Sequence, residues 1–122
     1  MNKWNIIKSL IENKDFEGLQ DILHDEYLYL RETTLISKDE MVSFIKKRFE
    51  DGLTFEKLEL IIENKDLLAW RDVLIEHGGK KWETTNVQLW KDNKVWRDVV
   101  SVRDLEKVDP IENLNEKSFL HK

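Results

Sequence analysis

The chain repeats one four-residue sequence, Trp-Arg-Asp-Val, at residues 70–73 and 96–99. Two turn signals lie between the copies, Gly78-Gly79 and Asp92-Asn93. Two-residue loops of this composition favour type I′ turns between antiparallel strands. The stretch therefore predicts three antiparallel strands in which the two copies flank a central strand. We expect these strands at about residues 67–77, 80–91 and 94–104.

Centring the loops on these turns predicts the strand register, and with it the face on which each side chain lies. Val87 is then expected between Trp70 and Asp98, and Thr85 between Asp72 and Val100. Both faces of this sheet would carry tryptophan, whereas a sheet with one wet face should alternate apolar and polar residues. We assign the more apolar face, that of Trp70, to the helices. The other face is assigned to a second copy of the chain, and it would carry Arg71, Trp82, Gln88, Trp90 and Arg97.

Three helical patterns precede the repeat. Apolar residues at helical spacing predict a helix over residues 3–13, and Asp15 can cap a second helix that reaches Leu23. Ser37 and Glu40 form a capping box for a third helix, which is expected to end near Gly52.

Two further segments read as strands. Residues 27–31 are rich in aromatic residues and leucine, which favours a short strand followed by a loop at 32–34. From Thr54 the apolar period changes to two, which predicts a strand at about 54–63.

Together these elements predict an α+β fold, with three N-terminal helices packed on a curved antiparallel β-sheet. Residues 1–104 would form one domain, since a chain of 122 residues is long enough for a single core. Residues 105–122 contain Pro110 and many polar side chains, which predicts an irregular or partly disordered C-terminal tail.

Composition argues against several function classes. The chain has no cysteine, and its three histidines lie far apart, so no metal site and no cofactor are expected. Acidic and basic residues are mixed, with a net charge of −5, which argues against nucleic-acid binding. No apolar run is long enough to span a membrane, and the N-terminus lacks the apolar core of a signal peptide. We therefore expect a cytoplasmic protein without membrane or nucleic-acid partners.

The order of these elements resembles the NTF2-like superfamily, and its SnoaL-like members in particular. Residues 12–16 with Leu19 resemble the family's joint after the first helix, residues 25–29 its following strand, and residues 91–95 its Asp-Gly-Lys-Ile hairpin. The resemblance covers about residues 4–104. It implies a cone-shaped fold with a pocket between helices and sheet, and frequent homodimers. The family includes isomerases, cyclases, hydrolases, dehydratases and non-catalytic members.

The end of the chain is similar to one enzymatic branch, the limonene-epoxide-hydrolase-like proteins. That branch has Trp-Arg-Asp in its last strand, as at residues 96–98, and a strand tyrosine that Tyr29 matches. Its companion Arg-x-Asp falls at residues 72–74, which read Asp-Val-Leu, and its asparagine falls at Arg31. The water-activating set is incomplete, so we do not carry that activity over.

Asp98 and Asp72 are the candidate catalytic residues. Carboxyl groups in an apolar pocket have raised pKa values, so one can serve as general acid and the other as base. In the alternative, each is paired with another group or lies at the open rim of the pocket. The residues expected to line the pocket are Tyr29, Trp70, Trp96, Val87 and Leu58.

Three functions remain open from the sequence. The protein could bind a small apolar molecule in the cone between helices and sheet. It could be a cofactor-independent isomerase, dehydratase or hydrolase that uses Asp98 and Asp72. It could also be a structural homodimer whose cone is filled by Trp70 and Trp96.

Overall fold

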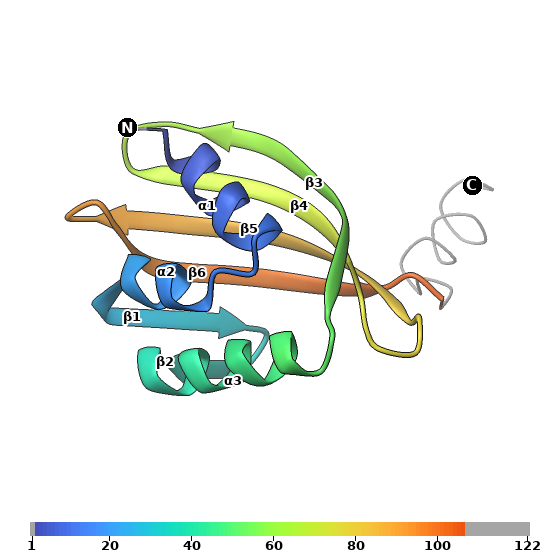
Figure 1. Ribbon diagram of the computed structural model, residues 1–122. Helices are drawn as coiled ribbons and strands as arrows, with labels where there is room; N and C mark the ends of the chain where they lie inside the picture. The colour runs from blue at the N-terminus through green and yellow to red at the C-terminus, as the bar shows by residue number, and fades with distance from the viewer. Residues whose placement is uncertain (1, 107–122) are drawn as a thin grey trace, which may run out of the picture.

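A computed structural model describes residues 2–106 and shows three helices on one face of a six-stranded sheet (Figure 1). The helices are α1 (Lys3–Glu12), α2 (Phe16–Ile22) and α3 (Lys38–Glu50). The strands are β1 (Leu23–Arg31), β2 (Thr34–Ser37), β3 (Thr54–Glu63), β4 (Leu67–Ile75), β5 (Lys81–Lys91) and β6 (Lys94–Asp104). The α+β class is therefore confirmed. Most of the predicted tail, residues 105–122, lies outside the described residues.

The strand order is β2-β1-β6-β5-β4-β3. Neighbouring strands are antiparallel except for β1 and β6, which run parallel. The prediction of a wholly antiparallel sheet was therefore wrong at this one pair. Strands β1 and β6 are far apart in the sequence, and their pairing leaves no local pattern from which a direction could be inferred.

The helix starts follow their predicted caps. The Asp15 carboxylate accepts from the backbone N–H of Gly18, and Ser37 and Glu40 form the reciprocal capping box of α3. The strand after α2 begins at Leu23 rather than at residue 27, and β2 lies between the expected loop at 32–34 and the helix cap at Ser37, where no strand was predicted. The longer β1 is stabilised by pairing with β6, which is distant in the sequence, and β2 is stabilised by pairing with β1 across a hairpin. These pairings override the local preference of each segment.

The loop between β4 and β5 is one residue longer than predicted. The backbone N–H of Glu76 donates to the carbonyl of Lys80, which leaves three residues, His77–Gly79, in the loop. Trp70 therefore pairs with Asn86, and Asp72 pairs with Thr84. The predicted register of β5 was wrong by one residue, and such a slip moves every side chain of the strand to the other face.

The loop between β5 and β6 is the predicted two-residue turn, with Asp92 and Asn93 at φ 54° and 62°. A β-bulge follows it. Trp90 pairs with Val95, whereas Leu89 pairs with Arg97, so Trp96 is the extra residue. Beyond the bulge Gln88 pairs with Asp98.

In the meander of β4, β5 and β6, the extra loop residue and the bulge each shift the register by one residue, and the two shifts cancel between β4 and β6. Asp72 on β4 and Asp98 on β6 both face the helices, while β5 is inverted between them. Thr84, Asn86, Gln88 and Trp90 are buried on the inner face instead of lying on the outer one.

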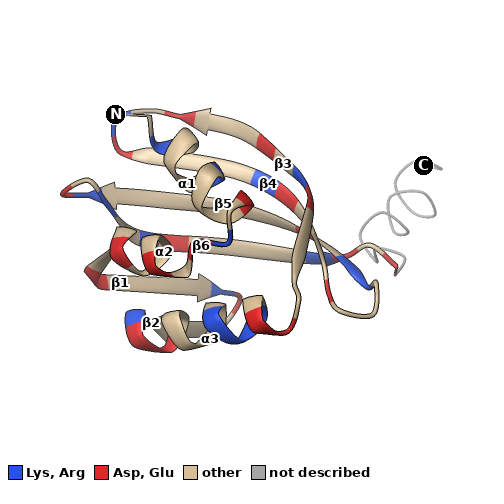
Figure 2. Cartoon of the chain, in the orientation of Figure 1, with Lys and Arg blue, Asp and Glu red and all other residues tan. Residues whose placement is uncertain are grey.

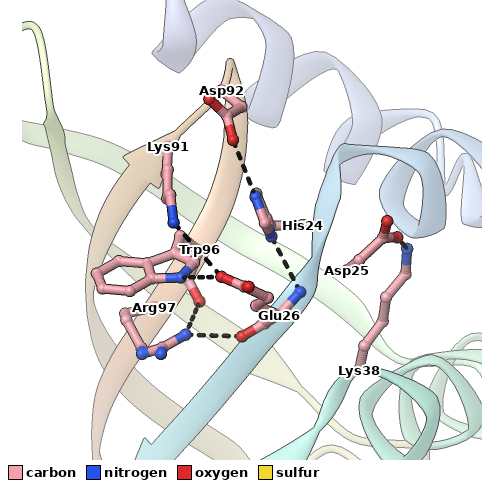
Figure 3. A network of polar contacts seen from close by, with 8 residues as sticks. All are labelled: His24, Asp25, Glu26, Lys38, Lys91, Asp92, Trp96 and Arg97. Atoms are coloured by element: carbon pink, nitrogen blue, oxygen red, sulfur yellow. Dashed lines mark hydrogen bonds and ion pairs between the residues drawn. The ribbon is translucent and has the colours of Figure 1, made fainter.

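Trp96 lies outside the core, within a polar network that Figure 3 shows. Its indole N–H donates to Glu26 Oε1 at 3.4 Å, and the Arg97 guanidinium stacks 3.8 Å from the ring centroid. Arg97 Nη1 also donates to the Glu26 carbonyl at 2.7 Å, and Lys91 Nζ lies 3.4 Å from Glu26 Oε1. These contacts tie β1 to the bulge and keep Val95, rather than Trp96, in the core.

The core lies between α1 and the inner face of the sheet. Ile7, Leu68 and Val95 are the largest fully buried side chains, and Trp4 packs against Trp70 with ring centroids 5.9 Å apart. Across residues 2–106, no helix is both long and apolar enough to cross a membrane.

Candidate functional site

A cavity of about 520 Å³ lies between the helices and the inner face of the sheet. This is within the usual range for small-molecule sites. The helices contribute mainly apolar side chains, and the sheet contributes a polar set. The helical lining residues are Ile7, Ile11, Leu19, Ile22, Met41, Phe44, Ile45, Arg48 and Phe49.

Four of the residues expected at the site line this cavity: Asp98, Asp72, Tyr29 and Trp70. Val87 and Trp96 do not line it, and this corrects their expected position. Val87 lies on the outer face because β5 is inverted, and the bulge turns Trp96 outward.

Leu58 also lies away from the cavity. It packs partly buried against the core and lines a separate hollow between α1 and β3, with Ile11 and Phe55 among its neighbours.

Asp98 has one close hydrogen-bond donor among the described residues. The Tyr27 hydroxyl donates to Asp98 Oδ2 at 2.9 Å, while Oδ1 is buried and has no hydrogen-bond partner among the described residues. Burial raises the pKa of Asp98 to about 7, against the lowering effect of Tyr27 and of Gln88, which faces it on β5. Asp98 therefore changes its protonation state near neutral pH.

Asp72 is also buried but is better provided with donors. The indole of Trp70 and the amide of Asn86 each donate to Oδ2 at 3.2 Å, and the Thr84 hydroxyl donates to Oδ1. Burial still raises the pKa of Asp72 above its ordinary value, and these three hydrogen bonds act against that rise. This arrangement holds the Asp72 side chain in one orientation.

Sequence reasoning missed four polar residues of the site. Tyr27, rather than Tyr29, donates to Asp98, and Thr84, Asn86 and Gln88 come from the inverted strand β5. Tyr27 could have been found, because residues two apart in a strand share a face. The three β5 residues could not, because their face depends on the length of the preceding loop.

Charged side chains border the cavity near the C-terminal ends of α3 and β1. Arg48 of α3 pairs with Glu76 at 3.4 Å, and Arg31, the last residue of β1, and its neighbour Glu32 also line the cavity. Figure 2 shows basic residues at the tip of β1 and in the last turns of α3. Trp82 lines the cavity as well.

Residues 2–106 contain no group of three or more histidine or acidic side chains arranged to hold a metal ion. The sheet wall of the cavity offers the carboxyl groups of Asp72 and Asp98, two tyrosine hydroxyls and neutral amide and hydroxyl groups, and the charged side chains of Arg31, Glu32, Arg48 and Glu76 complete the lining.

No protein-family model and no curated protein matches the sequence. Solved structures do match the fold. An NTF2-like protein of unknown function from Burkholderia xenovorans gives a TM-score of 0.64 at 13% identity, covering 89% of this chain and 86% of its own. An LEH-like epoxide hydrolase from M. tuberculosis gives 0.64 at 15% identity, covering 84% and 82%. A candidate isomerase of the SnoaL-like family from Agrobacterium tumefaciens gives 0.60 at 11% identity, covering 81% and 95%.

Sequence identities this low establish the fold and leave the activity open. The predicted resemblance is confirmed at that level: the chain has the fold of NTF2-like proteins, including SnoaL-like and LEH-like members.

The raised pKa of Asp98 makes stability depend on pH. Between about pH 4, where the unfolded state ionises, and pH 7, the folded state retains a proton that the unfolded state has lost. The contribution of Asp98 to stability should therefore fall as pH rises through this window, by about 1.4 kcal/mol per pH unit and at most about 4 kcal/mol in all, and stay constant above it. Asp98→Asn should remove this loss in denaturant unfolding measured from pH 4 to 8.

Tyr27→Phe tests whether the pKa of Asp98 causes this pH dependence of stability. Removing the hydroxyl that stabilises ionised Asp98 should move the end of the window to higher pH. Equal pH dependence in the wild type and Asp98→Asn would show that Asp98 is ionised at an ordinary pKa.

Proposed function

We propose that the protein binds a small, mostly apolar molecule in the cavity between its helices and its sheet. The observation that carries this proposal is an open volume of about 520 Å³ with an apolar helical wall and a cluster of polar side chains on the opposite wall. Apolar lining with a few convergent polar groups is the usual composition of small-molecule sites. Trp70 lies in the wall and Trp96 lies outside, so these residues do not fill the cavity, which argues against a solely structural protein.

The polar cluster suggests how such a ligand would be oriented. Asp72 is held by three donors and is saturated, whereas Asp98 Oδ1 has no partner among residues 2–106. An unpaired buried oxygen costs free energy, and a ligand group that reaches it would recover that cost. Asp98 is therefore the group that we expect to meet the polar part of the ligand.

A cavity-filling variant tests this proposal. The neutral fluorophore N-phenyl-1-naphthylamine should bind the wild type with increased fluorescence, and Val102→Trp should weaken binding about tenfold or more by occupying the volume. Ser101→Trp is the matched control, because the neighbouring side chain points to the outer face of the same strand. Equal binding by both variants would place the probe outside the cavity, and no binding to the wild type would contradict the proposal.

The second candidate function is cofactor-independent acid–base catalysis, as an isomerase, dehydratase or hydrolase. A carboxyl with a pKa of about 7 in an apolar cavity is poised to gain or lose a proton at neutral pH. Asp98 would be the proton-transferring group. Asp72 lies on the same wall, and its charge acts to raise the pKa of Asp98.

Catalysis can be tested on a panel of small epoxides, unsaturated ketones and hydroxy ketones. For any substrate turned over, Asp98→Asn should lower kcat about 100-fold or more, the usual contribution of a general acid or base. Binding of the neutral fluorophore should remain. Asp25→Asn, at a highly exposed carboxylate on β1, is the control. Unchanged turnover in Asp98→Asn would eliminate the acid–base role.

We also propose a homodimer through the outer face of the sheet, with a corrected set of residues. Arg71 and Arg97 lie on that face, but Gln88 and Trp90 are buried on the inner face and Trp82 lines the cavity. The pairing register instead aligns one apolar residue from every strand across the outer face. This row is Leu35, Leu30, Val99, Val87, Ala69 and Ile62.

Four members of this row give it an exposed apolar surface: Leu35 at 60%, Ile62 at 49%, Val99 at 46% and Leu30 at 40% exposure. Contiguous apolar surface of this kind marks an interface. Light scattering should therefore report a dimer for the wild type and a monomer for Val99→Asp, with Ser101→Asp on the polar part of the same face as control. A monomeric wild type at high concentration would contradict the proposal.

A further inference from the structure

One cation at the end of the cavity has no carboxylate partner among residues 2–106. Arg31 lines the cavity at the end of β1, and no described carboxylate lies within ion-pair distance of its guanidinium, including that of its neighbour Glu32. Arg48, the other arginine of the lining, is already paired with Glu76 at 3.4 Å. The charge of Arg31 is thus available to a ligand, whereas the charge of Arg48 is largely neutralised by Glu76.

Arg31 belongs to the cavity and not only to the solvent-facing edge. Tyr27, Tyr29 and Arg31 alternate along β1 and all three line the cavity. Burial raises the pKa of the Tyr29 hydroxyl, while the charge and hydrogen bond of Arg31, two residues along on the same face of β1, lower it. Tyr29 also pairs in register with Asp98 on β6. A line of polar groups therefore runs from Arg31 past Tyr29 to Asp98.

The apolar helical wall faces this line. Phe44, Ile45 and Phe49 of α3 line the cavity opposite the sheet. A molecule lying along the line would meet a cation at one end, an apolar surface along its length and a carboxyl group at the other end.

We propose that the ligand is an amphipathic organic acid, whose anionic group pairs with Arg31 while its apolar body lies against α3. This inference rests on the proposed binding function and adds the chemical class of the ligand. Guanidinium groups form bidentate, charge-assisted hydrogen bonds with carboxylates and other oxyanions, which gives both affinity and orientation. An uncharged polar group near the other end of the molecule would reach Asp98.

Two probes that share an aromatic skeleton test the proposal. 8-Anilinonaphthalene-1-sulfonate carries a sulfonate, and N-phenyl-1-naphthylamine lacks it. Arg31→Gln should weaken binding of the anionic probe about tenfold, as expected for loss of a charge-assisted hydrogen bond, and should change the neutral probe by less than about twofold. Arg31→Lys should retain part of the preference for the anionic probe over the neutral one. Lys65→Gln, which removes an exposed cation in the β3–β4 turn, should change neither.

The outcomes separate this inference from the proposed function. If both probes bind the wild type but Arg31→Gln affects them equally or not at all, the anion selectivity is wrong and the binding function stands. If neither probe binds, the binding function fails and the ligand class fails with it. Displacement of the anionic probe by decanoate, but not by decanol, would extend the result to carboxylic acids, and equal displacement by both would contradict it.

Discussion

The bulge at Trp96 is the local constraint on which the inner face of the sheet depends. A strand alternates its side chains between two faces, so one inserted residue exchanges the faces of everything beyond it. The insertion puts Val95 in the core before the bulge and Asp98 on the inner face after it. It is tied from outside by Glu26 of β1, through the Trp96 indole and the Arg97 guanidinium (Figure 3).

The three-residue loop before β5 completes this arrangement. With one residue fewer, Thr84, Asn86 and Gln88 would face outward, and Asp72 would lose two of its three donors. A buried carboxyl without partners is costly, so the loop length and the carboxyl groups are physically coupled. The inner face thus holds Asp72 in a complete hydrogen-bond set and leaves Asp98 Oδ1 without a partner among the described residues.

Much of the fold could be predicted from local pattern. The capping box at Ser37, the cap at Asp15 and the turn at Asp92-Asn93 each depend on residues close in sequence, and each forms as expected. The parallel pairing of β1 with β6 depends on residues about 70 positions apart, and it could not be inferred locally.

The site shows the same division between local and distant causes. The two copies of Trp-Arg-Asp-Val suggested that Asp72 and Asp98 share a face. They do so because the register shifts from the longer loop before β5 and from the bulge in β6 cancel. Gly78-Gly79 suits a loop of two or of three residues, so the sequence could not decide the face of β5. Trp96 was expected inside because nothing near it in sequence indicates the bulge, whose contacts come from Glu26.

Burial in the cavity makes Asp98 a carboxyl group that titrates near neutral pH. The titration of Asp98 can be measured directly by NMR of the aspartate side-chain carbonyl carbons, with the Asp98 signal assigned by its absence in Asp98→Asn. The structure predicts a midpoint at about pH 7 for Asp98. A midpoint near pH 4, that of a solvated aspartate, would show that Asp98 is ordinarily ionised and would contradict this account of the site.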